Sequence, residues 1–291
     1  MYRVMRARAI ECLAKCVPGL EPAGEMRWSF ALANGRALPV TASIEEGWLA
    51  LEAPLEEAAA GTPLFRLLEW NGQLDGPGKF VAVSGGALHL RAEIALDEAV
   101  DIAGRLHESC AGFRAALGRS HGESPAAHAV IGPGPIEAGG AQLRQALGES
   151  GWAFTERAGG RLAVELEARE GFYQALVEQR GVGGVRLWVE LARAQALSAA
   201  SRQALGLLLL TAGGALRPAR GAAEASDGQM ALRLEVDFAT PPGAAELGHA
   251  LAALSVGCRL CGEEVKLLED ESIAGRYLRI RHSSTTEGEN L

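Results

Sequence analysis

A stretch of sequence that occurs twice constrains the fold of this chain more than any other feature. Leu90-Arg91-Ala92-Glu93-Ile94 matches Leu232-Arg233-Leu234-Glu235-Val236 almost letter for letter. Apolar and polar residues alternate in both segments, and this period of two is typical of a strand with one buried face. In the residues that follow each segment, up to Leu117 and Leu268, apolar residues recur at steps of three and four, which predicts an amphipathic helix. The chain therefore predicts two copies of one small α+β unit.

The order of elements around the repeat predicts the extent of each copy. In residues 1–119 the patterns predict a helix, three strands, a helix, two strands and a helix, an α-β-β-β-α-β-β-α unit with a mostly antiparallel sheet. Residues 136–282 repeat this order, with a longer hairpin and a loosely specified stretch at 213–227. Each copy has an apolar surface to bury, so we expect the copies to pack as a pseudo-dimer. The composition of 120–135 predicts a linker, and the polar residues 283–291 predict a flexible tail.

Short motifs suggest how the two copies align. Trp152-Ala153-Phe154 matches Trp28-Ser29-Phe30, and Gly171-Phe172 stands where Gly47-Trp48 stood. These aromatic residues could form an exposed platform. They recur, however, at positions that alternate toward the buried face of a strand, which favours burial. Residues Glu21–Glu25 are expected to form a turn.

Bulk properties argue against two classes of partner. The net charge is −8 at pH 7, and no Lys/Arg cluster is longer than Arg6-Ala7-Arg8, so we expect no nucleic-acid binding. The longest apolar run, Ala204–Leu216, is shorter than the roughly 20 residues that cross a bilayer. The 5 cysteines are an odd number in a chain too long to need disulfides, which favours a reducing cytoplasm.

The cysteines offer one candidate metal site. Cys12-x3-Cys16 and Cys258-x2-Cys261 could together supply four thiolates to a structural zinc ion. Both pairs, however, lie on apolar helical faces, where a free cysteine behaves as a small hydrophobic residue. We therefore interpret them as core residues.

Other motifs also favour ordinary structural roles. The 6 histidines lack the spacing of a metalloenzyme, and Gly181-Val182-Gly183 begins a dinucleotide fingerprint but has Arg186 in the place of the third glycine. Glu165 and Glu167 fall on one outward strand face, where paired carboxylates could act as acid and base but are more often a solvated surface. We predict no catalytic residue, cofactor or metal ligand.

The order helix, three strands, helix, two strands, helix in an acidic unit of this size resembles the class I type III secretion chaperone fold, which YbjN-like bacterial regulators share. Members of the chaperone family are usually single units that form homodimers, and an extended segment of a secreted effector wraps around them. The resemblance implies a bacterial, cytoplasmic, non-enzymatic protein in which such a dimer is fused in tandem and holds a protein or peptide client. Such an intramolecular pseudo-dimer could be a monomer in solution.

Two alternatives stay open. The chain could be a YbjN-like regulatory or structural protein without a secretion client, or an enzyme with a site between the two copies. The resemblance rests on topology and the internal repeat, so it assigns no partner-contact residue.

Overall fold

The structure of the protein is a computed structural model that describes residues 2–34, 36–55, 62–83, 87–120, 136–169, 171–181, 183–194, 196–226 and 228–287. The first half contains α1 (Tyr2–Cys16), β1 (Glu21–Gly24), β2 (Arg27–Asn34), β3 (Arg36–Glu45), β4 (Trp48–Pro54), α3 (Leu64–Asn71), β5 (Lys79–Ala82), β6 (Leu88–Ala95) and α4 (Ile102–Ser120). The second half contains α5 (Ile136–Glu149), β7 (Thr155–Glu156), a 3-10 turn η2 (Ala158–Gly160), β8 (Leu162–Ala168), β9 (Gly171–Arg180), β10 (Gly184–Ala194), α6 (Ala199–Ala215), β11 (Arg220–Ser226), β12 (Gln229–Phe238), α7 (Ala244–Leu267) and α8 (Glu271–Glu287).

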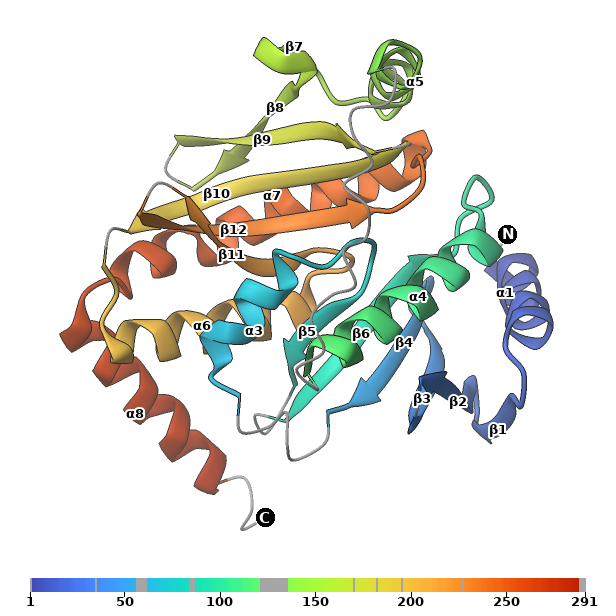
Figure 1. The fold of residues 1–291 in the computed structure, drawn as a ribbon, viewed down its shortest axis with the longest axis horizontal. Helices are drawn as coiled ribbons and strands as arrows, with labels where there is room; N and C mark the ends of the chain where they lie inside the picture. The colour runs from blue at the N-terminus through green and yellow to red at the C-terminus, as the bar shows by residue number, and fades with distance from the viewer. Residues whose placement is uncertain are drawn as a thin grey trace.

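The described strands form two six-stranded antiparallel sheets with the same order (Figure 1). The first sheet runs β1-β2-β3-β4-β6-β5 and the second runs β11-β12-β10-β9-β8-β7, which is the same order read from the other end. The repeated segments are β6 and β12, and each pairs with both neighbours in the antiparallel sense. The predicted α+β class and the tandem repeat are therefore confirmed.

Tight turns set the register of the hairpins. Between β3 and β4 the two turn residues, Glu46 and Gly47, have φ of 47° and 85°. Two successive residues with positive φ are the signature of a type I′ turn, whose twist matches that of the strands it joins. Glu45 accordingly pairs with Trp48 across this turn.

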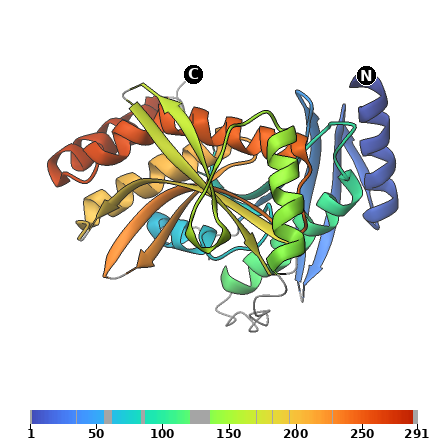
Figure 2. The same cartoon turned by 90° about the horizontal axis from the view of Figure 1, so that it is seen from above.

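Helices cover one face of each sheet, as the amphipathic stripes predict (Figure 2). In the second half α7 packs on β8, β10 and β12, and α5 packs on α7; in the first, α4 packs on β2 and β6, and α1 packs on α4. The α7 side chains predicted to form its apolar stripe are all buried: Leu247, Leu251, Leu254, Cys258, Cys261, Val265 and, just after the helix, Leu268. No described helix combines the length and hydropathy needed to traverse a bilayer.

The strand-by-strand alignment of the copies predicted from short motifs is wrong by one strand. Among the described residues each half has four strands before its middle helix, where three were expected. Residues predicted as a turn form β1, and the two-residue strand β7 is too short to show a period. Consequently Phe172 lies in β9, the counterpart of β3, and Trp152 precedes β7 instead of matching Trp28 in β2. The hairpin of β9 and β10 is therefore not an insertion, because it corresponds to β3 and β4.

The boundaries of the second half also differ in detail from expectation. The loosely specified stretch 213–227 contains the end of α6, a loop and β11. A further helix, α8, follows α7 and continues to Glu287, so it includes the beginning of the predicted tail. Most of the predicted linker, 121–135, and the last residues, 288–291, lie outside the described residues.

The two units pack through equivalent elements. The middle helices α3 and α6 contact each other, α3 packs on the edge strand β11 of the second unit, and α6 packs on the edge strand β5 of the first. Gly206 of α6 permits this close approach, since a Cβ there would lie 2.8 Å from Leu64 Cβ of α3. Each surface patch thus meets its own counterpart, as in a dimer with two-fold symmetry, and the predicted pseudo-dimer is confirmed.

A buried cation at the start of each edge strand completes this symmetry. Lys79 Nζ lies 2.8 Å from Glu93 Oε2 in its own unit and donates to the carbonyls of Gly213, Leu216 and Ala219 in the other unit, at 2.6–3.2 Å. Burial lowers the pKa of Lys79, while the charge of Glu93 opposes this shift.

Arg220, the first residue of β11, repeats the arrangement from the other side. Its guanidinium lies 2.7 Å from Glu235 Oε1, the counterpart of Glu93 in the repeat. It also donates to three carbonyls of the first unit, those of Leu74, Gly76 and Gly78, at 2.7–2.9 Å. The interface therefore contains two reciprocal cation sites that satisfy loop carbonyls across it.

Lys79→Met should lower the free energy of unfolding by about 3–5 kcal/mol, because it leaves three buried carbonyls without their donor and the fully buried Glu93 carboxylate with Arg91 alone as its cation. The Lys79 and Glu93 side chains are both 0% exposed. Urea denaturation followed by circular dichroism measures the change. The matched control is Lys15→Met, at an exposed pair with Glu11, which should change the value by no more than about 0.5 kcal/mol. A loss below about 1 kcal/mol for Lys79→Met would contradict the assignment.

Candidate partner-binding groove

The second unit has an open groove at the end of its sheet that lies farthest from the first unit. The groove has a volume of about 590 Å³. It lies between the segment that joins α5 to β7, the outer part of β8, the start of β9 and the middle of α7. Its lining residues are Gly151, Trp152, Ala153, Phe154, Thr155, Ala163, Glu165, Glu167, Phe172, Ser255 and Arg259.

The groove runs along a strand edge that the sheet leaves unpaired. The register of β7 and β8 contains only Thr155 with Ala163 and Glu156 with Leu162. A backbone hydrogen bond from Arg157 N to Arg161 O fixes which residues face β7. Because the ladder of an antiparallel pair alternates, the N–H and C=O groups of Glu165 and Glu167 also point toward this side. No described strand pairs with them there, so this edge can accept another strand.

Aromatic side chains flank this edge. Phe172 is 73% exposed, and it pairs across the strands with Glu167. Trp152 and Phe154 are half-buried, and so is Trp28, whereas Phe30 is buried. The burial prediction therefore holds fully for Phe30 and in part for the other three, which pack against the core with one side exposed. Trp152 and Phe154 precede β7 and line the groove.

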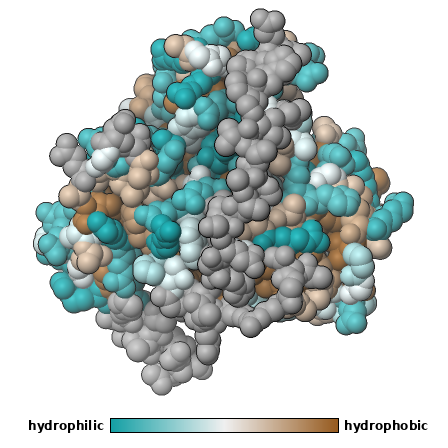
Figure 3. Space-filling view, viewed as in Figure 1, coloured by the Kyte–Doolittle hydropathy of each residue, from teal (hydrophilic) through white to brown (hydrophobic). Residues whose placement is uncertain are grey.

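A second depression, of about 580 Å³, lies on the outer face of the same sheet, but charged residues of that sheet pair within it. Arg161 pairs with Glu178, and Arg193 with Glu190. The guanidinium carbons of Arg161 and Arg233 lie 5.8 and 5.7 Å from the centre of the Trp188 ring. These contacts hold the arginine side chains against carboxylates and a ring of their own sheet. On the face shown in Figure 3, hydrophilic and hydrophobic residues are mixed.

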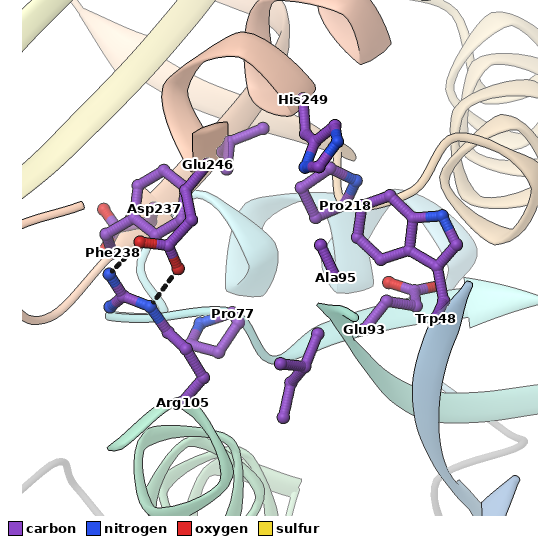
Figure 4. A pocket seen from close by; sticks show the side chains of 12 residues that line it. Trp48, Pro77, Glu93, Ala95, Arg105, Pro218, Asp237, Phe238, Glu246 and His249 are labelled. Carbon is purple, nitrogen blue, oxygen red and sulfur yellow. Dashed lines mark hydrogen bonds and ion pairs between the residues drawn. The ribbon is translucent and has the colours of Figure 1, made fainter. Parts of the chain in front are cut away.

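A small cavity lies between the two units (Figure 4). It has a volume of about 30 Å³, which is room for about one water molecule. Arg105 of α4 donates to Glu246 of α7 at 2.6 Å and to Glu108 at 2.8 Å. Burial alone would lower the pKa of Arg105, but these carboxylates outweigh it and raise the pKa. The contact therefore joins the two units through an ion pair whose guanidinium stays protonated.

His249 lines the same cavity. Its ring lies 5.5 Å from that of Trp48 in the first unit, centre to centre, and its buried Nδ1 has no hydrogen-bond partner among the described residues. A water molecule in the cavity would supply that partner. No sequence pattern singles out His249, since it lacks a metal-ligand spacing. At about 30 Å³ this cavity is much smaller than typical ligand pockets of about 300–1,000 Å³.

The four candidate zinc ligands lie on two different units. Cys12 and Cys16 are on α1, and Cys258 and Cys261 are on α7. Among the described residues, no group of three or more His, Cys, Asp or Glu side chains is placed to hold a metal ion. Burial raises the pKa of Cys258 to about 12 and that of Cys261 to about 11. Both thiols are therefore protonated at neutral pH.

Sequence patterns identified part of the groove. Alternation correctly placed Glu165 and Glu167 on one outward face, and both are exposed. The short-motif alignment places Phe172 on the wrong strand, and no sequence pattern predicts the unpaired edge. A two-residue strand such as β7 leaves no periodic signal. The sequence therefore does not indicate that β8 extends beyond the end of β7.

Cys258 and Cys261 should resist a thiol reagent such as dithionitrobenzoate at pH 8. With pKa values of about 12 and 11, only about one thiol in ten thousand and one in a thousand is the reactive thiolate. Their labelling should follow unfolding, whereas the half-buried Cys12 and Cys16 react earlier. Peptide mapping of the labelled protein over time measures the order, with the denatured protein as control. Equal rates for Cys258 in the folded and denatured protein would refute the assignment.

In comparisons with known proteins, no family model, no curated protein and no solved structure matches this chain.

Proposed function

We propose that this chain is a non-enzymatic protein-binding module that holds an extended segment of a partner protein. The partner would add to the second sheet as a further strand alongside β8. Its backbone would pair with the outward N–H and C=O groups of Glu165 and Glu167, and its side chains would enter the groove. This mode of recognition obtains affinity from backbone hydrogen bonds and specificity from alternate side chains.

The observation that carries this proposal is the unpaired β8 edge beside an aromatic groove. An exposed strand edge readily pairs with another chain, and proteins usually cover or disrupt such edges. Here the neighbouring strand β7 stops after two residue pairs. Phe172, 73% exposed, stands next to the open part of the edge. An edge and an exposed aromatic side chain at one place favour a partner that covers both.

The pseudo-dimer supports a chaperone-like role. Two units with the same strand order pack through equivalent elements, which is the architecture that a fused homodimer of class I type III secretion chaperones would have. By this resemblance the client would be a secreted effector, and the setting would be the bacterial cytoplasm. A YbjN-like regulator could use the same groove for a client that is not secreted.

Glu165→Pro should weaken binding of a segment by about tenfold or more, because proline removes an outward N–H and leaves no donor for the added strand. The ligand is a 12-residue peptide selected from a random library by the full chain, and fluorescence anisotropy measures its dissociation constant. The pairing of β8 with β9 should survive, since the substituted N–H points away from β9.

Two controls separate the backbone effect from other causes. Glu165→Ala keeps the N–H and should bind far better than Glu165→Pro. Ala31→Pro places the same residue on β2 of the first unit, beyond the end of its pairing with β1, and should leave binding unchanged. If the selected peptide binds Glu165→Pro and Glu165→Ala equally well, strand addition at β8 is wrong.

A further inference from the structure

Building on the proposed function, we infer that the segment held at β8 alternates basic and apolar residues, with Lys or Arg directly opposite Glu165 and Glu167. The chemistry of the edge defines this pattern. Glu165 and Glu167 are both exposed, lie two residues apart on one face, and line the groove. An added strand places side chains directly opposite them, where opposite charges attract and like charges repel.

The other face of the same edge favours apolar residues. Val164 and Leu166 alternate with the two glutamates and are buried toward α7, which packs on β8. Every second side chain of an added strand falls on this side, near Trp152 and Phe154. Arg259 belongs to α7 and therefore to this side, so a lysine opposite Glu165 points away from it.

A second copy of the chain is a poor occupant of the edge. If two β8 edges paired antiparallel about Leu166, Glu165 of each copy would lie opposite Glu167 of the other. Like charges placed directly opposite each other destabilise a strand pair, and charged residues on edge strands commonly prevent such pairing. The chain as a whole carries a net charge of −8, which adds to the repulsion between copies and attracts a basic segment.

The test compares three nine-residue peptides by fluorescence anisotropy with the full chain. One alternates Lys and Val, one alternates Glu and Val, and one has the composition of the first with its Lys and Val residues in separate blocks. The alternating Lys peptide should bind about tenfold tighter than the alternating Glu peptide, through two attractive pairs in place of two repulsive ones. It should also bind tighter than the block peptide. In the variant Glu165→Lys/Glu167→Lys the preference should reverse.

Each other result overturns the inference. Equal binding of the Lys and Glu peptides, both weakened by Glu165→Pro, would refute the charge pattern and leave strand addition standing. Equal binding of the alternating and block Lys peptides would show that the net charge of the peptide, and not the alternation of its residues, determines its affinity. If neither the charge reversal nor Glu165→Pro changes the affinity of the Lys peptide, the peptide binds at a site other than β8. Failure of all three peptides to bind, with the library-selected peptide still bound, would refute the pattern alone; failure of that peptide too would refute the proposed function.

Discussion

The pairing of the two units depends on burying a cation at the start of each inner edge strand. Lys79 and Arg220 each neutralise a carboxylate of their own unit and donate to three carbonyls of the other. Buried carbonyl groups without a donor are costly, so neither loop could be buried unless the opposite unit were in place. The reciprocal contacts therefore join two cores into one structure.

This pairing also covers one edge of each sheet. β5 and β11 are edge strands, and in a separate unit each would expose its backbone groups. In the joined protein the middle helix of the other unit packs on each of them. The duplication thus covers the inner edge of both sheets. Under the proposed function, a partner strand adds to the outer edge of the second sheet, at β8. Because both units lie on one chain, the paired state does not depend on protein concentration.

Sequence patterns predicted the units and their symmetry but not the edge. The repeat of Leu90–Ile94 in Leu232–Val236 predicted the two-unit architecture, because strands with a period of two and helices with an apolar stripe give a strong sequence signal. The groove depends instead on how far β8 extends beyond its pairing with β7, and this is set by the register of the two strands. The buried Lys79 and Arg220 were also invisible, since a charged residue at the start of a strand is usually a surface residue, and only the opposite unit makes it an interior one.

Helix α7 connects the interface to the groove. Near its N-terminus Glu246 accepts hydrogen bonds from Arg105 of the first unit, and in its middle Ser255 and Arg259 line the groove. The helix is buried along its inner stripe, from Leu247 near the first unit to Val265. The Arg105–Glu246 pair therefore links the first unit to the helix that forms one wall of the groove. Under the proposed function, this contact would connect the first unit to a segment that touches only the second.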